Sequence, residues 1–205
     1  METHEIESKF ELSKEDFVRV KEFSQVKELK EQLNIYFDFN NSLSEKAITF
    51  RVRVNGTKNP KMTLKIPIDS TSGAREVIEV EQELNSEYDA RNISVINISK
   101  DLPQEFKKYL RSLNLDYLYK VGEMRTNRWV TSLNNKFEIE MDEVLLPDGR
   151  EFFEVEIEND EYNYRKKAEA ILKSITPNLI PSHCSKYERF TDAILKLSSD
   201  KEFSI

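Results

Sequence analysis

Six segments of this sequence alternate between apolar and ionisable residues, and this alternation limits the chain to a few kinds of sheet. At residues 5 to 9, Glu5, Glu7 and Lys9 alternate with Ile6 and Ser8. Successive side chains of a β-strand point to opposite faces, so these three charges share one face. The pattern recurs at residues 48–54, 61–66, 79–83, 137–142 and 153–158. The sequence therefore predicts strands with one apolar and one charged face.

The sign of the charge is segregated between these segments. Residues 48–54 and 61–66 carry only arginine and lysine on the charged face, whereas the last three segments carry only glutamate and aspartate. Like charges two apart on a strand repel, and a solvent-facing sheet would normally dilute them. An antiparallel sheet with one face in water would explain any single strand with a charged face. Six such strands, with acidic and basic residues kept on different strands, favour a closed barrel. There, acidic strands face basic strands across a lumen that binds cations and polyanions.

Helices are predicted where apolar residues recur every three or four positions. Ser13 is expected to cap a first helix that runs as far as Leu33. Its apolar side would comprise Phe17, Val20, Phe23, Val26, Leu29 and Leu33. Three further helices are expected at residues 102–113, 161–175 and 188–197. We expect all four to lie outside the barrel and cover its apolar face.

Length and charge narrow the classes of function. A chain of 205 residues suits a single domain covering residues 1–205. Its net charge of -7 opposes binding to nucleic acid or to an anionic membrane unless basic residues gather locally. There is no apolar run of membrane-spanning length and no signal-peptide pattern at the N-terminus. Cys184 is the single cysteine, so a cytoplasmic protein without disulfides is expected.

Several short motifs, in order along the chain, resemble the CYTH domain, or triphosphate tunnel metalloenzyme, superfamily. Glu5, Glu7 and Lys9 form the E-x-E-x-K motif that defines this family. The other resembling segments are Tyr36-Phe37-Asp38, Arg51-Val52-Arg53, Thr63-Leu64-Lys65, Glu79, Thr126-Asn127-Arg128, Asp142, Phe153-Glu154-Val155-Glu156 and residues 185–190, which read SKYERF. The resemblance spans nearly the whole chain.

This resemblance implies an α+β fold, namely an eight-stranded antiparallel β-barrel that forms a tunnel with a charged interior and helices packed outside. It implies metal-dependent hydrolysis of a small triphosphate, inorganic tripolyphosphate or thiamine triphosphate, by a monomer or homodimer. The alternatives are an adenylate cyclase of the class IV type, which would need an adenine pocket, and a noncatalytic polyphosphate or nucleotide sensor. The chemistry expected is phosphoryl transfer to water without a side-chain nucleophile.

The resemblance also implies roles for individual residues. Mg²⁺ or Mn²⁺, which prefer oxygen ligands, would be held by Glu5, Glu7, Glu154 and Glu156, with Glu79 and Asp142 as supporting or second-metal ligands. The phosphate-binding residues would be Lys9, Arg51, Arg53, Lys65, Arg128, Lys186 and Arg189. Of these sets, Glu5, Glu7, Lys9 and Lys65 would act directly in catalysis.

Other residues of the charged rows do not match the family pattern. Glu81, Glu83, Glu138, Glu140 and Glu158 extend the acidic faces, and we expect them near the mouths of the barrel and in water. Arg125 also falls outside the pattern. Tyr36 and Phe37 are expected to be strand residues, and Asp38 to stabilise the turn that follows.

Overall fold

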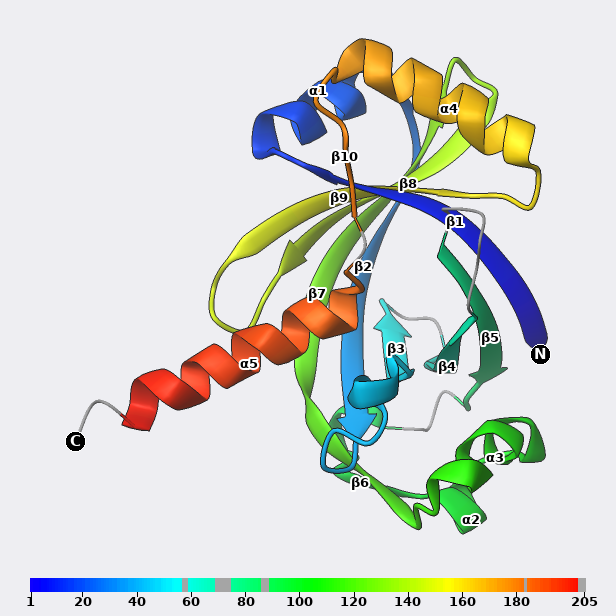
Figure 1. Cartoon of the computed structure of the whole chain (residues 1–205), viewed down its shortest axis with the longest axis vertical. Coiled ribbons are helices and arrows are strands. Elements are labelled where there is room, and N and C mark those ends of the chain that lie inside the picture. Colours follow the sequence, from blue (N-terminus) through cyan, green and yellow to red (C-terminus); the bar gives the residue numbers. More distant parts are fainter. Residues whose placement is uncertain (57–58, 69–74, 86–88, 183, 203–205) are drawn as a thin grey trace.

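The computed structural model describes residues 1–56, 59–68, 75–85, 89–182 and 184–202, and within these ranges eight antiparallel strands close into a barrel. Around the barrel they follow the order β1, β5, β4, β3, β2, β7, β8 and β9, and β9 pairs back with β1 (Figure 1). Their bounds are β1 Glu2–Leu12, β2 Gln25–Asp38, β3 Thr49–Asn55, β4 Lys61–Ile68, β5 Arg75–Glu83, β7 Tyr117–Leu133, β8 Phe137–Leu145 and β9 Glu151–Glu158. The predicted fold class is confirmed.

The closure depends on β1, which pairs with two different strands. Residues 2 to 7 of β1 pair with β5, and residues 7 to 12 pair with β9. Two short strands extend the sheet, β10 (Ile180–Pro181) beside β1 and β6 (Val95–Asn97) beside β7. Because β1 pairs with both β5 and β9, its Glu5, Glu7 and Lys9 lie where the acidic β9 meets the rest of the barrel.

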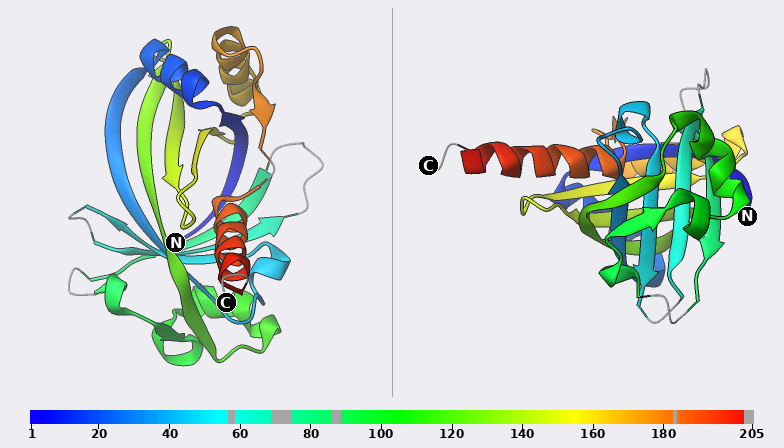
Figure 2. Two further views of the ribbon diagram at one scale, coloured as in Figure 1. Left: turned by 90° about the vertical axis from the view of Figure 1, so that its left-hand side faces the viewer. Right: turned by 90° about the horizontal axis from the view of Figure 1, so that it is seen from below.

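Four helices cover two apolar patches on the outer face of the barrel. The α1 helix (Lys14–Phe23) and α4 (Tyr162–Ile175) cover one patch, where Phe17, Val20 and Leu172 pack against β8 and β9. The α2 helix (Ile98–Asp101) and α3 (Gln104–Leu110) cover the other, where Phe106 and Leu110 pack against β2, β3 and β4 (Figures 1 and 2). Three 3₁₀ turns complete the described elements, η1 Ser44–Lys46, η2 Ala90–Asn92 and η3 Arg111–Leu113. The apolar rows thus face the helices and leave the charged rows to the interior.

The last helix, α5 (Lys186–Glu202), closes one end of the barrel at its start and then extends beyond it (Figure 2). Tyr187 and Phe190 join an apolar cluster with Tyr36, Met124 and other residues whose side chains face the interior. Phe190 packs against β7 at Gly122. A Cβ added to Gly122 would lie 2.8 Å from Phe190 Cζ. A glycine at this position is therefore what lets α5 approach the strand.

The predicted first helix is wrong beyond Phe23. The α1 helix starts as expected, with Ser13 Oγ accepting a hydrogen bond from Asp16 N, but it ends at Phe23 and β2 follows. Val26 and Leu29, expected on the apolar side of the helix, are half-exposed strand residues. Residues 26–32 are good helix formers, and pairing with β7 overrides that preference. The other predicted helices are present as α3 with η3, as α4, and as an α5 that starts two residues earlier.

No helix in the described ranges combines the length and the apolar composition needed to cross a bilayer.

Candidate functional site

All eight strands contribute residues to one lumen, and in every strand except β2 these include charged side chains. Cross-strand pairs bring opposite charges together there, for example Lys9 with Glu156 and Lys65 with Glu79. A cavity of about 300 Å³ occupies this lumen. It is lined by Glu5, Glu7, Lys9, Tyr36, Thr49, Arg51, Arg53, Lys61, Lys65, Arg75, Glu79, Glu81, Arg128, Glu140, Glu156, Glu158, Ser185, Lys186 and Tyr187.

A trio of buried carboxylates lies in one wall of the lumen. Asp142 on β8 and Glu154 and Glu156 on β9 each offer an oxygen within 4.8 Å of the others. Three cations surround this acidic trio. Lys186 Nζ lies 2.8 Å from Asp142 Oδ2 and also contacts Glu154 and Glu156, Arg128 binds Asp142 and Glu156 at 2.6 Å, and Lys9 Nζ lies 2.7 Å from Glu156 Oε1.

The ionisation of the acidic trio reflects competition between burial and these cations. Burial by itself would favour protonation of all three, but Arg128 and Lys186 keep the pKa of Asp142 below its usual range. Lys186 and Lys9 hold the pKa of Glu156 well below its usual range. Burial prevails at Glu154 and raises its pKa. Two carboxylates are thus held ionised beside a third whose pKa is raised by burial.

The acidic trio fits a divalent cation. Its donors are all carboxylate oxygens, which Mg²⁺ and Mn²⁺ prefer. Moreover, Glu154 Oε2 is buried and has no hydrogen-bond partner among the described residues. Buried acceptors are rarely left unpaired unless something else binds them. Asp142, Glu154 and Glu156 are therefore the residues best placed to hold a metal ion.

Glu5 and Glu79 form a second acidic pair, on the side of β1 that adjoins β5. Their side chains share a hydrogen bond, and Lys65 Nζ lies 2.5 Å from Glu5 Oε2 and 3.4 Å from Glu79 Oε1. Burial and the bond to Glu79 raise the pKa of Glu5 to about 8. Burial opposes ionisation of Glu79 too, but the bond from Glu5 and the charge of Lys65 lower its pKa to about 2. The pair therefore shares one proton at neutral pH.

A basic region on β3 completes the lumen. Arg51 is buried and lies 3.8 Å from Glu79, which is too far for a strong ion pair. Arg53 Nε donates to Asn34 Oδ1 at 2.9 Å. Burial, together with the charges of Arg51 and Arg128, lowers the pKa of Arg53 to about 9. This mutual repulsion would be relieved by an anion in the lumen.

Most of the predicted site residues meet in this lumen. Those that line it are Glu5, Glu7, Lys9, Arg51, Arg53, Lys65, Glu79, Arg128, Glu156 and Lys186. Asp142 and Glu154 lie directly behind the lining, bound to Lys186. Arg189 does not line it, since its guanidinium lies 2.6 Å from Glu11 Oε2, so its phosphate contact stays a prediction.

Several lining residues are not among the predicted ligands. Arg75 lies 3.3 Å from Glu7 Oε1, and its position four before Glu79 on the same strand would have placed it on the inner face. Lys61, Thr49 and Ser185 also line the lumen. Of the glutamates expected near the mouths, Glu81, Glu140 and Glu158 line it, whereas Glu83 and Glu138 are exposed outside the lining.

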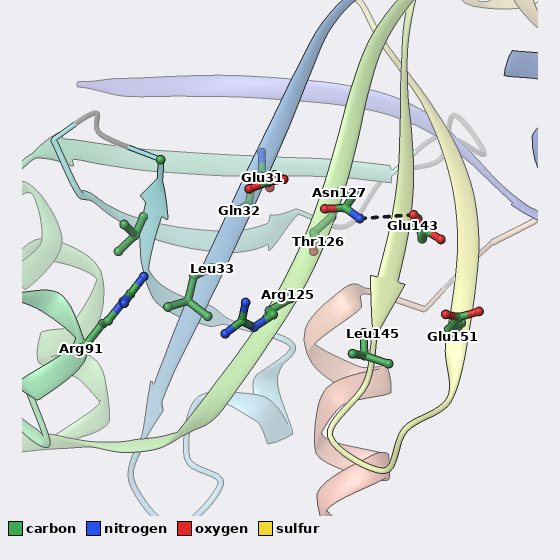
Figure 3. Close-up of a pocket in the computed structure, with 12 residues that line it drawn as sticks. Glu31, Gln32, Leu33, Arg91, Arg125, Thr126, Asn127, Glu143, Leu145 and Glu151 are labelled. Atoms are coloured by element: carbon green, nitrogen blue, oxygen red, sulfur yellow. Dashed lines mark hydrogen bonds between the residues drawn. The ribbon is translucent and has the colours of Figure 1, made fainter.

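A larger hollow of about 440 Å³ lies elsewhere, bordered by β2, β7 and β8 (Figure 3). Figure 3 shows Arg125 and Leu33 side by side, and Asn127 donating to Glu143 at 3.3 Å. Arg125 and Asn127 occupy positions of β7 that alternate with the lumen-lining Arg128, so their side chains lie on the outer face of the sheet. None of the predicted metal or phosphate ligands lines it, and the lumen is the better candidate site.

The fold and this site together define a closed antiparallel barrel with a charged tunnel. The chain belongs to the CYTH domain family, which it matches over residues 3–191. A candidate adenylate cyclase from Bacillus halodurans has the same fold, with a TM-score of 0.73, 24% identity, and coverage of 92% of this chain and 98% of that one. So does a candidate adenylyl cyclase from Hippeastrum described as having a dominant triphosphatase activity, with a TM-score of 0.74, 22% identity, and coverage of 92% and 95%. No curated protein sequence matches this chain.

Proposed function

We propose that this protein hydrolyses a small triphosphate, inorganic tripolyphosphate or thiamine triphosphate, inside its tunnel with the help of Mg²⁺ or Mn²⁺. The observation that carries the proposal is the arrangement of charges in the lumen. Cations from β1, β3, β4, β7 and α5 converge on a cavity of about 300 Å³ that also exposes carboxylates from β1, β5 and β9. A phosphate chain with bound metal needs both kinds of group within the same few ångströms.

The cations would hold and orient the phosphate chain. Arg51 and Arg53 present planar guanidinium groups suited to paired hydrogen bonds with phosphate oxygens, whereas Lys9 and Lys65 act as point charges. Each of these lysines also lies between carboxylates of different strands, so it fixes the acidic groups in place. In phosphoryl transfer, such positioning and charge neutralisation supply most of the catalysis.

Asp142, Glu154 and Glu156 would hold the metal ion, with Glu5, Glu7 and Glu79 as further carboxylates across the lumen. A divalent cation bound there would neutralise phosphate charge and act as a Lewis acid. Lys186 contacts all three members of the acidic trio. It would turn toward the phosphate chain when the cation takes over the neutralisation of these carboxylates.

The size and polarity of the lumen favour a small substrate. Sites for small organic ligands measure about 300–1,000 Å³ and are mostly apolar. This cavity lies at the lower limit of that range, and among the described residues its lining is polar or charged apart from Tyr36 and Tyr187. Apart from these two tyrosines, the described part of the lining offers an adenine ring no apolar side chain, which favours hydrolysis over cyclase activity.

The test is to offer tripolyphosphate, thiamine triphosphate and ATP with Mg²⁺ or Mn²⁺ and to follow orthophosphate, pyrophosphate and cyclic AMP together. Orthophosphate release from tripolyphosphate or thiamine triphosphate is the expected result. Cyclic AMP with pyrophosphate would replace the proposal with a cyclase, and tight binding without turnover would replace it with a sensor. Arg53→Met should abolish the activity, whereas Arg125→Met, on the outer face, is the matched control and should retain it.

A further inference from the structure

Tyr36 lies at the end of the lumen that α5 closes. Its side chain is 1% exposed, and its ring centroid lies 4.9 Å from that of Tyr187 and 4.8 Å from that of Phe190. In the pairing of β2 with β3, Tyr36 stands directly opposite Arg51, and both side chains line the cavity. The Tyr36 phenol therefore borders the lumen and also contacts the rings of Tyr187 and Phe190 on α5.

The hydroxyl proton of Tyr36 has no acceptor among the described residues, although the group is buried. The nearby charges are Arg51, which donates toward the phenol oxygen, Arg53 and Lys186, and none of these cations can accept the phenol proton. Burial raises the pKa of the phenol above its usual value, so the proton is present at neutral pH. A buried donor without an acceptor carries a cost in stability unless a ligand binds it.

A second donor nearby is in the same state. Arg51 Nε is also buried and without a hydrogen-bond partner in the described part of the chain. By contrast, the hydroxyl of the neighbouring Tyr187 donates to Asp38 Oδ2 at 3.1 Å, and Asp38 also accepts from the backbone of Phe39, Leu43 and Ser44. The two neighbouring tyrosines thus differ, since the Tyr187 hydroxyl donates to Asp38 within the protein, whereas the Tyr36 hydroxyl remains free to donate to a group in the lumen.

We propose that the closed end of the tunnel is a subsite for an unesterified terminal phosphoryl group, bound by the Tyr36 hydroxyl and Arg51 Nε. This inference rests on the proposed function, since it assigns the orientation of the triphosphate within the same tunnel. Only acceptor oxygens satisfy two unpaired donors, and a terminal phosphoryl group offers three. Tyr187 and Phe190 fill the space beyond, so an ester substituent on that phosphorus has no room.

Tyr36→Phe removes one hydroxyl group and leaves the aromatic packing in place. The loss of a hydrogen bond to a charged group should raise KM for tripolyphosphate by about 10- to 100-fold. We expect the melting temperature to stay at or above that of the wild type, because an unpaired buried donor is removed. Tyr164→Phe is the matched control, because the Tyr164 hydroxyl accepts a hydrogen bond from the Glu138 backbone outside the lumen, and this variant should leave KM within about twofold.

Two further measurements separate the failure of this inference from the failure of the proposed function. Diadenosine triphosphate, which has both terminal phosphoryl groups esterified, should fail to compete with tripolyphosphate in calorimetric binding. An unchanged KM in Tyr36→Phe, or competition by diadenosine triphosphate, would overturn the subsite while hydrolysis by the wild type stood. If the wild type neither bound nor hydrolysed tripolyphosphate or thiamine triphosphate, both proposals would fall.

Discussion

Lys186 Nζ lies 2.8 Å from Asp142 Oδ2, so the first residue of α5 neutralises the most buried carboxylate of the acidic trio. The same ammonium contacts Glu154 and lies 2.9 Å from Glu156 Oε1. Burial would lower its pKa, but these three carboxylates raise it instead. The N-terminus of α5, which closes the barrel, is thus held by ion pairs to the proposed metal ligands.

Replacement of Lys186 by methionine should destabilise the metal-free protein and make metal binding stabilising. Removing one partner of a buried ionic cluster leaves carboxylates uncompensated and costs about 3–5 kcal/mol of unfolding free energy. Mn²⁺ should recover much of that loss. Urea denaturation with EDTA and with Mn²⁺ measures both effects, and Lys196→Met, at an exposed position of α5, is the control. Wild-type stability of Lys186→Met in EDTA would contradict this account.

Glu156→Gln should abolish metal-dependent hydrolysis while the barrel still forms. Glu156 contacts Lys9, Arg128 and Lys186, so the amide removes a charge that organises three cations as well as a proposed metal ligand. Loss of one such electrostatic group lowers turnover by about 10²- to 10³-fold. Glu138→Gln changes an exposed residue of β8 and should turn over normally. Near-normal turnover by Glu156→Gln, with circular dichroism unchanged, would remove Glu156 from the metal set.

Gly122→Ala should loosen the seal between α5 and the barrel. The added Cβ would lie 2.8 Å from Phe190 Cζ, and overpacking of this kind costs about 1–3 kcal/mol. Phe190→Leu shortens the clashing side chain. The double variant should therefore lose less stability than the sum of the single variants, with a coupling of at least about 0.5 kcal/mol. Strict additivity in thermal unfolding would show that the close approach is not a constraint.

Metal affinity should rise with pH until about pH 8 if Glu5 is a ligand. The pKa of Glu5 is raised to about 8 by burial and by its bond to Glu79, so below that pH a proton must leave before its oxygens can bind a cation. Above pH 8 the carboxylate is already free and the affinity should level off. Mn²⁺ calorimetry at pH 6 to 9, in buffers of different ionisation heat, measures the affinity and the proton release.

Glu79→Gln provides the control for that experiment. It removes the anion that shares the proton of Glu5, so the pKa of Glu5 should fall and fewer protons should be released at pH 7. An affinity that does not change between pH 6 and pH 8 in the wild type would exclude Glu5 from the metal ligands.

The two faces of each strand, and therefore most of the residues in the lumen, follow from the amino-acid sequence alone. Alternation assigns Arg51, Arg53 and Glu156 to the charged face whatever the topology, because the side-chain period of a strand is two. The separation of acidic and basic residues onto different strands, together with the order of the family motifs along the chain, then indicated a closed barrel. Where local preference was misleading, as in the helix predicted to run on to Leu33, the pairing of β2 with β7 decided the outcome.

Which charges meet and which groups remain unpaired depends on the folded barrel and not on the order of residues. No spacing in the sequence reveals that Lys186 contacts all three carboxylates of the acidic trio or that Glu5 shares a proton with Glu79, because these residues belong to distant elements. The same holds for Tyr36, an ordinary strand residue in the sequence and an unsatisfied donor in the lumen. Strand period is a local property of the backbone, whereas ionisation and hydrogen-bond satisfaction depend on burial and on neighbours that only the closed barrel and α5 bring together.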